Sequence, residues 1–257
     1  MTTEDKRLCV SFNDIESSND GDTCISCVTQ YLLKDLSGAV CIDVGADMGW
    51  WGRFCKYINE TNLVYAFEPN PASFSILNKQ SSDTFRIFNS AVSDITGEVH
   101  MDFQGSNSNS RGNTGTLVKT TKLDFIFDSV RTVDIIKIDT EGHDIIIVKS
   151  LEPFFTRINT IIFEFTVYWN GADRTECMQN SLNALELVYD RYPYVYIASR
   201  RSFPKLFRIT DIDNLMPIII TLMQVGLQVD IVCSVTAVAS IEILEDTLFL
   251  ENFTAVV

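Results

Sequence analysis

The chain has 257 residues, long enough to bury a sizeable core as one large α/β domain or two small ones. Its hydrophobic content of 46% and charged content of 21% exclude disorder for most of the chain and are typical of a soluble globular protein. The 34 acidic and 20 basic residues give a net charge of -14, which repels phosphate backbones and anionic lipid, so we expect no nucleic-acid partner.

The N-terminal residues 1–20 are polar and predict a flexible arm, which is followed by a single predicted domain over residues 21–257. The chain begins with charged residues instead of an apolar signal segment, and its seven cysteines are an odd number. We therefore expect reduced thiols and a cytoplasmic location. Cys24 and Cys27 form a CxxC without a second CxxC or a histidine cluster to complete a zinc site, and we expect no bound metal.

Apolar periodicity predicts an alternation of strands and helices in the first two thirds of the chain. Helices are predicted at 24–36, at 71–80 with Pro71 at its start, and at 144–155. Strands are predicted at 39–44, 63–69, 85–93, 133–142 and 160–165. Such an alternation is typical of an α/β fold with a parallel sheet.

The Gly/Ser/Asn-rich residues 104–114, between the flanking segments 97–103 and 115–123, lack apolar side chains and predict a mobile loop over an active site. A helix at 176–192, a hairpin of 194–201 with 205–210 and a final strand at 229–235 complete the predicted elements, and residues 237–257 stay unassigned. The apolar residues 215–235 include Asp230, which costs about 2.5 to 3.5 kcal/mol at mid-bilayer. We therefore predict a buried helix, a break at Gly226 and a strand, with no membrane span.

A glycine turn follows the strand at 39–44, and its sequence runs from Gly45 through Asp47 to Gly49. A loop between a parallel strand and a helix presents unpaired N–H groups to a ligand. Asp47 stands where dinucleotide-binding loops carry a glycine, and its charge would repel a pyrophosphate by several kcal/mol at an effective dielectric of about 20. S-adenosylmethionine carries a sulfonium and an ammonium instead, so an acid suits it. Asp43 either orients the loop or reaches that ammonium through water, and Glu68 at the end of the next strand suits the ribose hydroxyls of either cofactor.

Five blocks of the chain occur in the order and approximate spacing of a known family. They read IDVGADMGWWGRF, VYAFEPNPASFSIL, FNSAVSDITGEV, TTKLDFIF and DIIKIDTEGHDIIIVKSLEPFF, within residues 39–165. The chain resembles the FkbM-type S-adenosylmethionine-dependent methyltransferases. That resemblance implies a doubly wound, mostly parallel seven-stranded sheet with an antiparallel last strand, a cofactor-binding half at 39–165 and a substrate-side half at 166–257.

The resemblance also implies cofactor contacts and an acceptor. Relatives of this family methylate hydroxyl groups, often on sugars, so a small-molecule or glycan hydroxyl is expected as the acceptor. The contacts to S-adenosylmethionine are expected from Asp43, Gly45, Asp47, Gly49, Glu68, Ser90 and Ala91. The chain departs from the family where Asp47 replaces a common asparagine, and where the last acid of the usual EGxE signature is Asp144.

Transfer of a methyl group to a hydroxyl needs an aligned oxygen and a base for its proton. The segment KIDTEGHD supplies candidates at the carboxyl end of a predicted strand, where ligands bind in open α/β sheets. His143 is the predicted base, because its ordinary pKa is closest to neutrality; otherwise it is a helix N-terminal residue bonded to backbone. Asp139 and Glu141 either orient His143 and hold sugar hydroxyls or cap the following helix, and Lys137 shares their face of an extended chain.

One residue at the end of the strand at 160–165 and one after it complete the predicted site. Glu164 and Trp169 combine an acid with an aromatic ring, as a sugar's hydroxyl rim and apolar face require. Two other functions remain open at this point. One is an NAD(P)-dependent oxidoreductase on the same type of sheet, which Asp47 disfavours, and the other is a catalytically silent binding module that keeps the cofactor fold.

Overall fold

The computed structural model describes residues 22–104, 107–109, 115–167, 173–198, 205–225, 228–239 and 242–245. The predicted arm at 1–20, Trp169 and the end of the unassigned tail lie outside the described residues. The chain divides into two compact units, of which one is Asp35–Phe163 and the other combines the described residues before Asp35 with those from Glu164 onward. Each unit is described by itself below.

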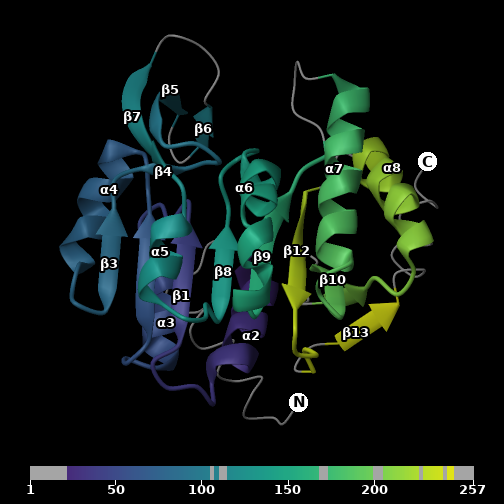
Figure 1. The fold of residues 1–257 in the computed structure, drawn as a ribbon, viewed down its shortest axis with the longest axis horizontal. Helices are drawn as coiled ribbons and strands as arrows, with labels where there is room; N and C mark the ends of the chain where they lie inside the picture. Colours follow the sequence, from purple (N-terminus) through teal and green to yellow (C-terminus); the bar gives the residue numbers. More distant parts are fainter. Residues whose placement is uncertain are drawn as a thin grey trace. The chain divides into compact units, whose positions relative to one another are not determined.

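Unit Asp35–Phe163 is built on parallel strands in the order β9-β8-β1-β2-β3 (Figure 1). These strands are β1 (Val40–Val44), β2 (Leu63–Phe67), β3 (Phe85–Phe88), β8 (Ile135–Ile138) and β9 (Thr160–Phe165), the last of which continues into the other unit. Their buried apolar residues form the core and confirm the predicted α/β fold with a mostly parallel sheet. Because the strands are parallel, the segments after β1, β2 and β8 emerge at one edge.

The helices of this unit follow their strands as predicted. Helix α3 (Trp50–Ile58) buries Trp51 and Phe54 and packs on β1 and β2. Helix α4 (Pro71–Leu77) begins at Pro71, where the Oδ1 of Asn70 accepts the N–H of Ala72 at 3.0 Å. Helix α5 (Asp124–Ser129) was not predicted, and its Phe125 ring lies edge-on to those of Phe67 and Phe88.

Three predicted elements are shorter than expected. The predicted strand 85–93 divides into β3 and β4 (Ala91–Val92), because β4 leaves the main sheet to pair with β7. The predicted strand 133–142 ends at Ile138, since the backbone turns at Glu141 and Gly142. The predicted helix 144–155 divides into α6 (Asp144–Ser150) and the 3-10 helix η2 (Glu152–Arg157), with a proline in the first turn of η2.

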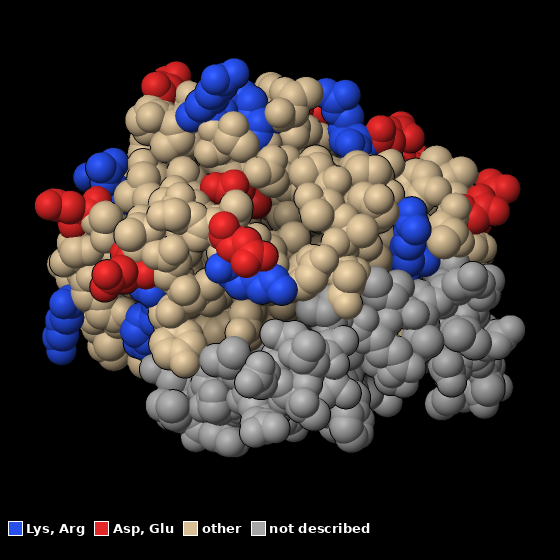
Figure 2. All heavy atoms as spheres, turned by 90° about the horizontal axis from the view of Figure 1, so that it is seen from below, with Lys and Arg blue, Asp and Glu red and all other residues tan. Residues whose placement is uncertain are grey.

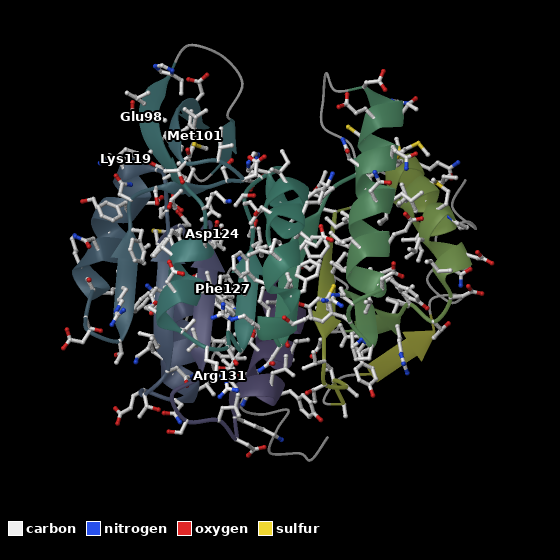
Figure 3. The ribbon with its side chains drawn as sticks, viewed as in Figure 1. Glu98, Met101, Lys119, Asp124, Phe127 and Arg131 are labelled. Carbon is white, nitrogen blue, oxygen red and sulfur yellow. The ribbon has the colours of Figure 1, made fainter. Side chains whose placement is uncertain are left out.

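A second sheet of the same unit has the order β4-β7-β5-β6 and lies toward the carboxyl ends of β3 and β8 (Figure 1). Its longer strands, β5 (Gly97–Gln104) and β7 (Thr116–Thr121), pair antiparallel and place Glu98 opposite Lys119 (Figure 3). The predicted mobile loop 104–114 is wrong for β6 (Asn107–Asn109), because these residues pair with the end of β5. The rest of that segment, 105–106 and 110–114, lies outside the described residues.

The other unit holds the helices α2 (Asp22–Leu33), α7 (Arg174–Tyr189) and α8 (Leu215–Val225) and the 3-10 helix η3 (Ile212–Asn214). Its strands are β10 (Tyr194–Ala198), β11 (Lys205–Arg208), β12 (Val229–Ser234) and β13 (Glu242–Glu245). Strand β12 runs antiparallel to β10, as the last strand of the predicted fold should. The predicted hairpin is confirmed by the antiparallel pair of β10 and β11. Strands β11 and β13 add to the seven that the family resemblance implies, and β13 was not predicted. The predicted helix and strand on either side of Gly226 are confirmed, and among the described residues no helix is long and apolar enough to cross a membrane.

Candidate active site

The glycine turn lies between β1 and α3 and has left-handed backbone at three residues: Gly45 has φ 77°, Asp47 φ 45° and Gly49 φ 86°. The N–H groups of Gly45 and Ala46 both donate to the carbonyl of Phe67 at 3.0 Å, which ties the turn to the end of β2. A Cβ on Gly45 would overlap the backbone carbonyl of Asp139, so only glycine fits there. The turn is thereby held tightly against the segment that follows β8.

Asp43 lies on β1 directly before the turn and is buried, with 1% of its surface exposed. Its Oδ2 accepts the N–H of Gly52 at 3.1 Å, and Gly52 is in the first turn of α3. Of the two roles predicted for Asp43, this contact directly supports the first, the orientation of the loop and helix. Asp47 also has a structural partner, because its Oδ1 accepts the hydroxyl of Ser73 on α4 at 2.6 Å.

Glu68 follows β2 and is held by backbone N–H groups at this edge of the sheet. Its Oε2 accepts the N–H of Asp47 and its Oε1 accepts the N–H of Asn70, both at 2.7 Å. Burial raises the pKa of Glu68 to about 7, in spite of these two hydrogen bonds, which act in the opposite direction. Glu68 therefore joins the glycine turn to the start of α4 and titrates close to neutral pH.

Ser90 and Ala91 were predicted as the end of the third strand, but β3 ends at Phe88. Ser90 is buried and lies between β3 and β4, while Ala91 begins β4 and pairs in register with Thr120 of β7. The side chain of Asn89 donates to the carbonyl of Glu68 at 2.9 Å. The segment after β3 is therefore tied to the same edge as Glu68.

The segment from Asp139 to His143 lies beside the glycine turn. The N–H of Asp139 donates to the carbonyl of Val44 at 2.9 Å, and the Nζ of Lys137 forms an ion pair with the Oδ2 of Asp139 at 3.0 Å. Lys137 and Asp139 thus share one side of the chain, as predicted. Glu141 departs from the predicted extended chain, because its φ of 56° places it in the left-handed region. Such a conformation in a non-glycine residue is enriched at functional sites.

Asp144 fixes the backbone of this segment through two hydrogen bonds. Its Oδ1 accepts the N–H of Thr140 and its Oδ2 accepts the N–H of Gly142, both at 3.0 Å. Burial, with the nearby charge of Asp139, raises the pKa of Asp144 to about 6. The last acid of the signature therefore has a clear structural role, which is to fix the turn that carries Glu141 and His143.

His143 is the N-cap residue of α6 and is partly buried. Its Nε2 lies 3.1 Å from the Oγ of Ser93, and that hydroxyl donates to the Oδ1 of Asp94 at 3.0 Å. Burial lowers the pKa of His143, while the charge of Asp94 opposes that shift. Sequence reasoning missed Ser93 and Asp94, because they lie 50 and 49 positions before His143, and the family block that contains them does not indicate a contact with it.

The two predicted substrate residues are placed differently from the rest. Glu164 lies on β9 at the point where the chain enters the other unit, and it is 3% exposed. Trp169 lies outside the described residues. The predicted cofactor and catalytic residues, by contrast, all belong to unit Asp35–Phe163.

The sequence profile of the methyltransferase FkbM domain matches residues 43–190. The hexuronic acid methyltransferase AglP of Haloferax volcanii is 24% identical over 169 residues, which are 62% of this chain and 70% of that protein. A precorrin-6y C5,15-methyltransferase from Geobacter metallireducens has a TM-score of 0.41 at 12% identity, with 82% of this chain and 88% of that chain covered. A putative rRNA-methylase from Clostridium thermocellum has a TM-score of 0.46 at 9% identity, with 87% of this chain and 99% of that chain covered.

Proposed function

The chain belongs to the FkbM methyltransferase family, whose members take their methyl group from S-adenosylmethionine, and on that basis we propose that it methylates a hydroxyl group of a sugar. One observation carries the proposal. The segment that bears His143 lies directly against the glycine turn, through the bond from Asp139 N–H to Val44 and the close approach of Gly45 to the Asp139 carbonyl. The segment that carries the predicted base is therefore in contact with the predicted cofactor turn, which supports the proposal.

The residues at this edge suit S-adenosylmethionine chemically. Asp43, Gly45, Asp47 and Gly49 would hold its methionine end, Glu68 its ribose, and Ser90 with Ala91 its adenine. Each carboxylate oxygen of Glu68 accepts one backbone N–H and keeps a lone pair for a hydroxyl. Three buried or partly buried acids around the turn favour a ligand with a sulfonium and an ammonium over one with a pyrophosphate. When bound, the cofactor supplies a methyl group that is activated by the positive sulfur.

His143 would take the proton from the acceptor hydroxyl. Its pKa is lowered by burial, which keeps the ring neutral and able to accept a proton at pH 7. Lys137, Asp139 and Glu141 belong to the same segment and are proposed to hold the acceptor's other hydroxyls. The charge of Lys137 is already balanced by its ion pair with Asp139.

The acceptor class is inferred from charge and from one relative. The relative named as a hexuronic acid methyltransferase acts, by its name, on a sugar acid. In this chain acids outnumber bases near the turn, and the net charge is -14, so we favour a neutral sugar over an anionic polymer or a nucleic acid. Figure 2 shows one face on which the described Lys and Arg side chains are scattered among Asp and Glu without forming a continuous basic surface.

Calorimetry with S-adenosylhomocysteine and with NAD tests the cofactor. The proposal predicts saturable binding of S-adenosylhomocysteine and far weaker binding of NAD. Binding of NAD without binding of S-adenosylhomocysteine would favour the oxidoreductase and overturn the proposal. Binding of S-adenosylhomocysteine without turnover of any hydroxyl acceptor would instead favour the silent module.

A further inference from the structure

A chain of three polar side chains links the predicted base to the surface of unit Asp35–Phe163. It runs from the Nε2 of His143 to the Oγ of Ser93 at 3.1 Å and on to the Oδ1 of Asp94 at 3.0 Å. Ser93 is 7% exposed, and its own N–H donates to the carbonyl of Thr121 at 2.9 Å, so its position is fixed by the sheet β4-β7-β5-β6. Asp94 is exposed.

The protons available on these three side chains determine which nitrogen of the neutral His143 imidazole is protonated. A serine hydroxyl has one proton, and a carboxylate has none to give, so the bond between Ser93 and Asp94 uses the proton of Ser93. The Oγ of Ser93 then meets His143 only with a lone pair. The contact between them requires that the ring donates, which places the proton of neutral His143 on Nε2 and leaves Nδ1 without one.

We propose that Ser93 and Asp94 are positioning residues that hold His143 in the Nε2–H tautomer, so that Nδ1 is the nitrogen that takes the proton of the acceptor hydroxyl. The inference rests on the proposed methyl transfer for its catalytic part, whereas the tautomer itself does not. In the reaction the hydroxyl oxygen bonds to the methyl carbon as the carbon–sulfur bond breaks, and the hydroxyl proton passes to Nδ1. The imidazolium then donates from Nε2 to Ser93 and releases its new proton to water.

In this proposal the sheet β4-β7-β5-β6 helps catalysis by positioning His143 through Ser93. Strand β4 pairs with β7, and this pairing places Ser93, the residue after β4, beside the segment after β8 that contains His143. A base whose second nitrogen is held by an oriented partner is the logic of many hydrogen-bonded catalytic sets. The partner here is a hydroxyl backed by an acid, and both come from a part of the chain that the sequence pattern did not assign to the site.

The tautomer is measurable without turnover, because the chain has only two histidines, His100 and His143. Two-bond proton–nitrogen correlation spectra of the ¹⁵N-labelled protein, assigned with a His100→Gln variant, distinguish the two tautomers of His143. We expect Nε2–H in the wild type above the pKa of His143. Asp94→Ala frees the proton of Ser93 to point at Nε2, so we expect a shift toward Nδ1–H. Since Asp94 is exposed, this variant should keep its fold, and Asp128→Ala, another exposed acid of the same unit, is the matched control.

The same variants separate positioning from binding. Asp94→Ala is expected to lower kcat about tenfold, with the KM of the acceptor and the Kd of S-adenosylhomocysteine changed less than twofold, while Asp128→Ala changes none of them. Observation of Nδ1–H in the wild type, or an unchanged tautomer in Asp94→Ala, would overturn the inference. If the tautomer behaves as expected and no hydroxyl acceptor is methylated, the proposed function fails while the positioning of His143 by Ser93 stands.

Discussion

Cofactor affinity should depend on pH through Glu68. Burial raises the pKa of this carboxyl from 4.5 to about 7, and the ionised form is the one that accepts hydrogen bonds from two ribose hydroxyls. Roughly one tenth of the protein has Glu68 ionised at pH 6 and roughly nine tenths at pH 8, so the Kd of S-adenosylhomocysteine should be about tenfold weaker at pH 6.

Isothermal titration calorimetry at pH 6, 7 and 8 measures this slope directly. In Glu68→Gln the amide cannot ionise, so binding should be weaker at pH 8 and nearly independent of pH. His143→Ala serves as the control, because it removes the imidazole and leaves Glu68 in place, so it should keep the wild-type slope. A flat wild-type profile, or an unchanged slope in Glu68→Gln, would refute the assignment of Glu68 to the ribose.

Three further predictions follow from contacts in the same unit. Gly45→Ala places a Cβ into the carbonyl of Asp139, whereas Gly38→Ala has a similar positive φ and open space, so urea unfolding should show at least about 2 kcal/mol more destabilisation for Gly45→Ala. Equal losses would contradict that close approach. Because the pKa of Glu68 is higher in the folded than in the unfolded state, its contribution to the free energy of unfolding is present below pH 4.5 and is lost as pH rises toward 7. Glu68→Gln should therefore remove about 3 kcal/mol of the pH dependence of that free energy between pH 4.5 and 8. An unchanged dependence would argue against a buried, titrating Glu68. His143→Ala should lower kcat by about 100-fold or more with the Kd of S-adenosylhomocysteine changed less than twofold, and unimpaired turnover would rule out His143 as the base.

The sequence was sufficient to predict most of the parallel sheet and the edge where the site lies. Short apolar runs between helical segments predict β1, β2, β8 and β9 because parallel strands are buried on both faces. The order of those strands then brings the glycine turn, Glu68 and the segment after β8 to one edge, which the contacts of Gly45 with Phe67 and Asp139 confirm.

The parts that sequence did not predict depend on contacts between distant residues. The segment 85–93 reads as one strand, yet pairing of β4 with β7 draws its second half into another sheet. Asp144 accepts backbone N–H groups only because the chain turns at Glu141. The left-handed backbone of Glu141 could not be predicted, because no sequence pattern indicates that conformation for a non-glycine residue. The contact of Ser93 with His143 joins two segments 50 residues apart, and no local pattern encodes such a pairing.

The central claim is that this chain transfers a methyl group from S-adenosylmethionine to an oxygen of a sugar. Incubation with ¹³C-methyl-labelled S-adenosylmethionine and a panel of neutral sugars and glycosides, followed by carbon–proton correlation spectra of the product, tests it most directly. The account predicts a labelled methyl ether and its loss in His143→Ala. A label on nitrogen or carbon, or no labelled product from a protein that binds S-adenosylhomocysteine, would contradict it.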